Sequence, residues 1–292
     1  VAAGKSRRGP TRRDLRTLTT FTIDSPSSRD LDDALSVYPA DADGGDARPP
    51  VLVVEDNASG CQARWYRNGA LQNSANFPFH LNAMEDVNNW IGRSMYSGDS
   101  NAHMSLDEFR IYRRAITPGE ILSSYAAGPD PAVGPPEPPV PAPIPSRRWT
   151  FNAAGGSAPG GTQVLDAATG EIATVRGNGA IFNGTELVLP ATATPGNQTA
   201  ANISAYLDLP NGLVSSRPSL TFEAWLTPLS SKNWQRIFDF GNSSLTSGPG
   251  AAPGEIIDGD SAPGGFISND NLFLSLNSAD ALGSQRIETK LG

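Results

Sequence analysis

Four aspartates near the N-terminus are the residues whose spacing most clearly suggests chemistry. The stretch FTIDSPSSRDLDDALSV, residues 21–37, contains Asp24, Asp30, Asp32 and Asp33. Carboxylate oxygens are the ligands that Mg²⁺ prefers, and a bound metal can activate water for phosphodiester cleavage. The alternative is the acidic first turn of a helix capped by Ser27 or Ser28, because carboxylates favour the positive end of the helix dipole.

The bulk composition favours a β-rich chain and excludes several classes of function. The 292 residues include 30 glycines and 25 prolines, which indicate many turns and few long helices. A net charge of −8 argues against a nucleic-acid-binding surface of the usual basic kind. A single cysteine, Cys61, excludes an internal disulfide and a cysteine-rich zinc site. No apolar run approaches the length of a membrane helix, so we expect no membrane insertion.

Changes in composition divide the chain into four parts. Residues 1–50 carry a basic block and then an acidic block, and predict a flexible segment. Residues 51–127 and 148–292 are β-rich. Between them, residues 128–147 hold nine prolines and read as an extended linker, which we interpret as a rigid spacer rather than a ligand for a proline-binding module.

The first β-rich part contains a hairpin and a helix with clear local signals. Asn68-Gly69 between strand-like flanks predicts a two-residue turn. A helix should start with a capping box and a proline at its first position, and should end at a glycine. The residues that mark it are Thr117, Pro118, Glu120 and Gly128.

The second β-rich part shows the two-residue period of half-buried strands. In SLTFEAWL the apolar residues fall on one face. These residues are Leu220, Phe222, Ala224 and Leu226. Trp225 alternates to the opposite face. Short strands separated by Gly, Asn and Pro turns predict an all-β, antiparallel jelly-roll sandwich.

Two sequence resemblances extend these inferences. The segments VLVVEDNASG, RWYRNGAL, NNWIGRSM and LDEFRIYRRAITPGEILSSY of residues 51–128 resemble the closing half of a laminin-G-like, concanavalin A-like jelly roll. The segments RWTFN, GNGAIFNGTELVLP, LTFEAWLTP and RIFDFGN of residues 148–292 resemble its opening half. Two arrangements fit this reversed order: one circularly permuted domain, or two truncated halves.

The laminin-G resemblance implies a binding function outside the cell. Such domains bind glycans or extracellular proteins, sometimes with calcium, on secreted or surface proteins; a purely structural repeat is the alternative. Because Trp225 leaves the apolar face, we expect it to be the best candidate for stacking on a sugar. Asp107 is a candidate calcium ligand, although solvated turn residues explain most of the acidic side chains in the loops. The oligomeric state does not follow from the sequence.

The N-terminal stretch is similar to a different family. RRDLRTLTTFTIDSPSSRDLDDALSV, residues 12–37, resembles the start of the catalytic domain of the RNase II and RNase R exoribonucleases. This resemblance implies magnesium at the four aspartates and RNA as the substrate. The family's RNA channel should follow at once, but the chain instead enters a Gly/Pro loop at residues 38–50. We therefore expect the motif to be inactive, and an exoribonuclease fragment is the alternative to a binding module.

Overall fold

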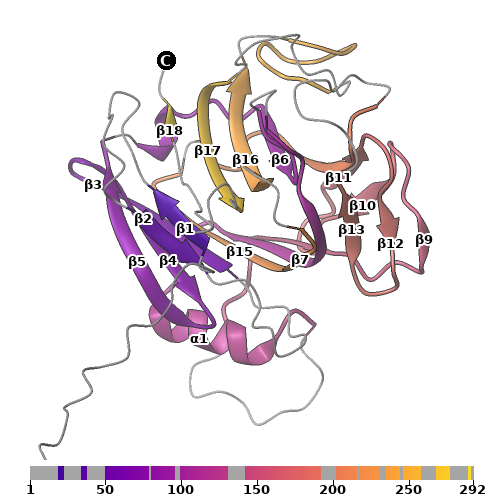
Figure 1. Cartoon of the computed structure of the whole chain (residues 1–292). Helices are drawn as coiled ribbons and strands as arrows, with labels where there is room; N and C mark the ends of the chain where they lie inside the picture. The colour runs from indigo at the N-terminus through magenta and orange to yellow at the C-terminus, as the bar shows by residue number, and fades with distance from the viewer. Residues whose placement is uncertain are drawn as a thin grey trace, which may run out of the picture.

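The computed structural model describes twelve ranges of the chain. They are residues 19–22, 34–37, 50–78, 80–95, 99–130, 142–191, 202–215, 217–230, 235–243, 246–257, 268–276 and 289–290. Within them, two antiparallel sheets face each other and one helix covers part of the larger sheet (Figure 1). This is the all-β jelly-roll sandwich that the sequence predicts.

The larger sheet joins strands from both β-rich parts of the chain. Among the described residues its order is β5–β4–β3–β15–β7–β13–β12–β9, and β8 also pairs with β7. The bounds are β3 Pro50–Asn57, β4 Gly60–Arg67, β5 Ala70–Phe77, β7 His103–Tyr112, β8 Arg147–Thr150, β9 Gly156–Ser157, β12 Ile181–Phe182, β13 Leu187–Pro190 and β15 Ser219–Pro228.

The smaller sheet is built in the same mixed way. Its order in the described part of the chain is β10–β11–β14–β6–β16–β17–β18. The bounds are β6 Asn88–Ile91, β10 Gln163–Leu165, β11 Ile172–Arg176, β14 Tyr206–Leu209, β16 Gln235–Ser243, β17 Ser268–Leu276 and β18 Thr289–Lys290.

The core lies between the two sheets and contains a cluster of phenylalanines. Phe222 of β15 lies 5.0 Å from Phe238 of β16, measured between ring centroids, and Phe109 of β7 lies 6.3 Å from Phe238. Leu220, Phe222, Ala224 and Leu226 all belong to this core, which confirms the predicted inward face of β15. Because side chains alternate along a strand, Glu223 and Trp225 point to the outer face of the larger sheet.

The predicted hairpin and helix are confirmed. Asn68 and Gly69 adopt φ angles of 52° and 74°, as a turn of this type between β4 and β5 requires. Helix α1, Pro118–Ala127, starts with the expected capping box: the Glu120 backbone N–H donates to the Thr117 hydroxyl. α1 packs on the outer face of the larger sheet over an apolar cluster. Its members are Val51, Val53, Tyr66, Tyr112, Ile116 and Ile121.

Two short strands are described within residues 1–50. They are β1, Thr19–Thr22, and β2, Ala34–Val37, which pair with each other, and β2 lies next to β5. The alternative of a helix beginning at Ser27 or Ser28 lies outside the described residues, and residues 34–37 form strand β2. The four aspartates of the predicted magnesium site lie outside the described residues.

Candidate functional site

The outer face of the smaller sheet carries a row of polar and aromatic side chains. In the register of β14, β6 and β16, Leu207, Ile91 and Phe238 are partners and all three point into the core. The next row is Asp208, Trp90 and Asp239, and side chains one position along a strand face the opposite way. This row therefore faces away from the sandwich core.

Two aromatic rings in this region enclose an arginine. Trp90 and Tyr206 meet edge to face with ring centroids 5.6 Å apart. The guanidinium carbon of Arg93 lies 4.2 Å from the Trp90 ring centroid and 4.7 Å from that of Tyr206. Arg93 also donates a hydrogen bond of 2.9 Å to the Tyr206 hydroxyl. All three side chains are buried, so neither ring has a face exposed for a ligand to stack on. The cluster therefore has a packing role.

Beside this cluster lies an ion pair that solvent reaches. Arg176 Nε donates to Asp208 Oδ2 at 3.0 Å, and the two side chains are 31% and 13% exposed. Burial raises the pKa of Asp208 to about 6, although the charge of Arg176 opposes the shift. A carboxylate next to a guanidinium presents hydrogen-bond acceptors and donors side by side. A ligand hydroxyl group can both donate and accept a hydrogen bond, so it can bind to such a pair.

A second set of ion pairs on the same sheet is more deeply buried than the Arg176–Asp208 pair. Arg236 Nη2 lies 2.8 Å from Asp99 Oδ2, and Arg236 Nε lies 3.4 Å from Asp239 Oδ2. The Met95 backbone N–H donates to Asp239 at 2.9 Å. Burial raises the pKa of Asp99, against the effect of Arg236. Asp239 is fully buried, whereas part of the Asp99 side chain is exposed.

Asp208 and Asp239 lie on opposite sides of Trp90, two strand spacings apart, which is about 9.5 Å. This is a distance between strands and not between carboxyl groups, so it does not identify the carboxylate pair of a glycosidase, whose separation is measured between the carboxyl groups. Asp239 is fully buried and accepts a backbone hydrogen bond. Asp239 therefore offers no exposed carboxylate at this surface.

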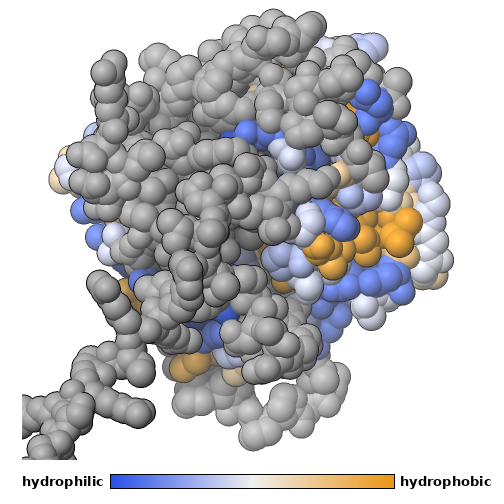
Figure 2. Space-filling view, in the orientation of Figure 1, coloured by the Kyte–Doolittle hydropathy of each residue, from blue (hydrophilic) through white to orange (hydrophobic). Residues whose placement is uncertain are grey.

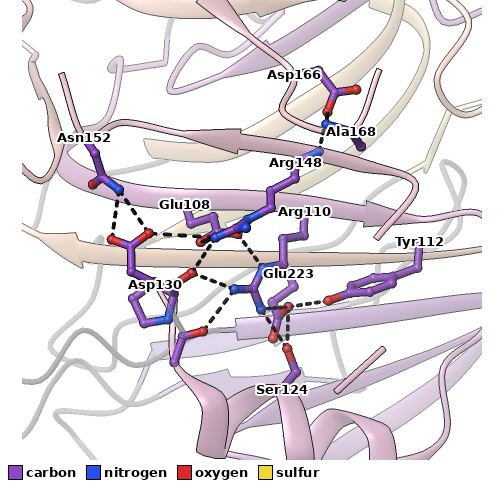
Figure 3. Close-up of polar contacts among 12 residues, drawn as sticks. Glu108, Arg110, Tyr112, Ser124, Asp130, Arg148, Asn152, Asp166, Ala168 and Glu223 are labelled. Atoms are coloured by element: carbon purple, nitrogen blue, oxygen red, sulfur yellow. Dashed lines mark hydrogen bonds and ion pairs between the residues drawn. The ribbon is translucent and has the colours of Figure 1, made fainter. Parts of the chain in front are cut away.

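A separate polar network lies on the outer face of the larger sheet, beneath α1 (Figure 3). Arg110 is at its centre: it lies 2.6 Å from Glu108 and 3.0 Å from Glu223, and donates to the Ser124 hydroxyl at 2.8 Å. Tyr112 donates to Glu223 at 2.8 Å. Burial opposes the charge of Arg110, but Glu223 and Glu108 outweigh it and raise the pKa of the guanidinium.

The same network holds both ends of the proline-rich segment (Figure 3). Arg110 donates to the Pro129 carbonyl at 2.8 Å, and Arg148 donates to it at 3.0 Å. Arg148 also binds both carboxylate oxygens of Glu108. Because Glu108, Arg110 and Glu223 are buried, this network is structural and is not a surface for a ligand.

Trp225, the predicted sugar-stacking residue, lies under α1. Its ring stacks on Tyr125 with an interplanar angle of 8° and centroids 6.4 Å apart, and the residue is 4% exposed. A sugar could stack on Trp225 only after Tyr125 moved away. Trp225 therefore stays a prediction, and the described surface favours the Arg176–Asp208 pair instead.

Asp107, the candidate calcium ligand, lies on β7 near other carboxylates. Burial, followed by the charges of Asp130 and Glu186, raises its pKa to about 6. Across the ranges that the structure describes, no group of three or more His, Cys, Asp or Glu side chains could hold a metal ion. Calcium at Asp107 and magnesium at the N-terminal aspartates both stay predictions.

Sequence reasoning missed the surface pair formed by Arg176 and Asp208. The two residues lie on neighbouring strands, β11 and β14, where Thr174 is the register partner of Asp208 and Arg176 that of Tyr206. Asp208 does alternate with the apolar Leu207 and Leu209 in the sequence AYLDLP, so its outward direction could have been inferred. Its partner could not be identified without the register.

Comparisons with known proteins agree with the fold. Residues 51–122 match the family model described as the concanavalin A-like lectin/glucanases superfamily. The matched range runs from β3 into α1, so the chain is similar to that superfamily over this part of the sandwich. The comparisons give no support to a relation between residues 12–37 and the exoribonucleases.

The other comparisons add no relative. No curated protein and no solved structure matches the chain. Among the helices that the structure describes, none is long and apolar enough to cross a membrane.

Proposed function

We propose that this chain is a non-catalytic binding module of a secreted or cell-surface protein, with a carbohydrate or protein ligand. The similarity of residues 51–122 to concanavalin A-like domains supports this class of function. The Arg176–Asp208 pair supports a location for it, because it is a partly exposed ion pair on the outer face of the smaller sheet. Its paired donors and acceptors suit sugar hydroxyls or polar groups of a protein.

A binding screen followed by one substitution tests this function. We would apply the labelled chain to a glycan array and to immobilised extracellular proteins. Arg176→Ala should weaken the binding of any ligand found by about tenfold or more, since it removes a charge-assisted hydrogen bond. Arg64→Ala is the matched control, because Arg64 is 27% exposed and pairs with Glu55 on the other sheet. Equal loss in both variants would contradict this location.

Two other functions predict different results. A purely structural repeat would bind nothing in either screen. An exoribonuclease fragment would shorten a labelled single-stranded RNA from its 3′ end in the presence of magnesium, and Asp33→Asn would abolish that activity. We expect no RNA degradation, because carboxylates without a channel supply neither substrate positioning nor charge stabilisation.

A further inference from the structure

Three arginines come together at one end of the larger sheet. Arg113 directly follows the last residue of β7. On one side of β7, Arg147 is the first residue of β8 and the register partner of Ile111. On the other side, Arg217 lies just before β15, which runs antiparallel beside the end of β7. The register therefore brings the three arginines, which are far apart in the sequence, to the same end of the sandwich.

Arg147 projects toward the smaller sheet, where two carboxylates hold it. The side chain of its partner Ile111 belongs to the core, and register partners project to the same face of a sheet. Arg147 Nη2 lies 2.9 Å from Glu171 Oε2, and Arg147 Nε lies 3.5 Å from Asp166 Oδ2. Both acids belong to the turn between β10 and β11. Arg147 is therefore fixed between the two sheets at the end of the sandwich.

The positive charge of this cluster exceeds its negative charge. Among the described residues, Arg147 forms ion pairs but Arg113 and Arg217 do not. Partial desolvation, followed by the charges of Arg147 and Arg217, lowers the pKa of Arg113. The charges of Glu171 and Asp166 oppose this shift without cancelling it. In addition, the Nε–H groups of Arg147 and Arg217 are buried and have no hydrogen-bond acceptor in the described structure.

The surface beside the two acids is apolar and does not compensate the excess charge. Figure 2 shows apolar residues gathered over the region of β10 to β13. Leu165 and Ile172, which precede Asp166 and follow Glu171 in the chain, are register partners and are 60% and 44% exposed. Aliphatic side chains offer an anion no hydrogen bond. An anion at this end of the sandwich is therefore bound by the guanidinium groups.

We propose that Arg113, Arg147 and Arg217 form a binding site for a tetrahedral oxyanion, namely a phosphate or sulfate group. A guanidinium donates its hydrogen bonds in a planar fork that fits the oxygens of such a group. A tetrahedral group also has more oxygens than a carboxylate, so it can accept from three arginines at once. The anion supplies acceptors for the two buried Nε–H groups and neutralises the excess charge. The cluster lies at the start of β11, whereas Arg176 is the last residue of that strand, so this proposal does not depend on the proposed function.

Titration of the full chain with sulfate, phosphate and acetate at constant ionic strength tests the site. The readout is the ¹H–¹⁵N correlation of the arginine Nε–H groups, in which Arg147→Lys and Arg217→Lys assign the two signals. We expect sulfate or phosphate to shift both signals to saturation, and acetate to require a concentration about tenfold higher or more. The tetrahedral anion that saturates the signals at the lower concentration identifies the preferred group. The absence of a saturable shift with either one, or an equal response to acetate, overturns the proposal.

Arg113→Ala and Arg114→Ala form a matched pair of variants. The two residues are adjacent and exposed, but Arg114 pairs with Glu120 of α1. Arg113→Ala should weaken binding of the oxyanion by about tenfold or more, since it removes a charge-assisted donor. Arg114→Ala removes the same charge one residue away and should weaken binding by less than about twofold, because salt screens exposed charges. Equal losses would show general charge attraction instead of a site, and would contradict the proposal.

Thermal unfolding separates loss of binding from loss of folding. Arg113→Ala removes one of three like charges, so without an oxyanion this variant should be at least as stable as the wild-type chain. Sulfate and phosphate also stabilise proteins by exclusion from the surface, and this effect is common to all variants. The added oxyanion should therefore raise the midpoint of the wild type and of Arg114→Ala more than that of Arg113→Ala. An equal rise in all three proteins, or an Arg113→Ala variant less stable than the wild type without the anion, would refute the proposed site.

Discussion

Removing the positive charge of Arg110 should be among the most destabilising single changes in this chain. The guanidinium lies within hydrogen-bonding distance of Glu108 at 2.6 Å and Glu223 at 3.0 Å, and both carboxylates are fully buried. Arg110→Met keeps much of the volume but leaves Glu223 without its cation, whereas Glu108 still has Arg148. Loss of one partner from a buried ion pair costs about 3–5 kcal/mol.

For a sandwich of this size, each kcal/mol shifts the thermal midpoint by about 2–4 °C, so we expect a fall of about 6–20 °C. Thermal and urea unfolding followed by circular dichroism would measure it. The control is Arg64→Met, which breaks the half-exposed pair with Glu55 and should cost at most about 1 kcal/mol. The double variant Arg110→Met/Glu223→Gln should recover part of the loss, because no uncompensated charge is then buried. A cost below about 1 kcal/mol for Arg110→Met would refute this reasoning.

Three further changes have clear expected outcomes. Asp107→Asn should raise the free energy of unfolding by about 1 kcal/mol at pH 8 and by little at pH 4. Burial and the nearby carboxylates raise the folded-state pKa of Asp107 to about 6, so ionisation of Asp107 above that pH destabilises the folded state. Solvent screening at this half-buried position keeps the effect small. Urea unfolding at both pH values measures this, and equal effects at the two values would contradict it. Thr117→Ala removes the hydroxyl that accepts the Glu120 N–H at the start of α1 and should cost about 1 kcal/mol in the same assay. Phe238→Ala opens a cavity among the core phenylalanines and should cost about 3–5 kcal/mol; a cost under 1 kcal/mol would mean that the core closes around it.

Local signals in the sequence were sufficient to predict most of the elements. The apolar alternation of SLTFEAWLTP predicts β15 and its inward face, and Asn68-Gly69 predicts the β4–β5 turn. In the folded chain RWTFN pairs beside DEFRIY, because Phe109 of β7 and Trp149 of β8 are register partners. Each of these signals depends on residues that are close in sequence or on a recognised family order.

The candidate site was harder to predict because it depends on distant neighbours. The alternation of β15 shows that Trp225 leaves the core, but it does not show that Tyr125 of α1 covers it. Likewise, Glu223 and Arg110 are separated by 113 positions, and only the β15–β7 register brings them together. The face of a strand can be read from its period, whereas what lies on that face comes from tertiary packing.

The mixed strand order has a consequence for the time at which the chain can fold during synthesis. β7 ends at Tyr112, and the last residue of β16 is Ser243, so the ribosome must add 131 residues (243 − 112) after β7 before the neighbours of β6 and β7 are all present. At about 5–20 residues per second this takes roughly 7–26 s. Until their neighbouring strands have been added, β6 and β7 expose apolar faces and unpaired edges, which favour association with other nascent chains. Folding should therefore be slow, as long-range pairing is, and the yield should increase when chaperones bind the nascent chain.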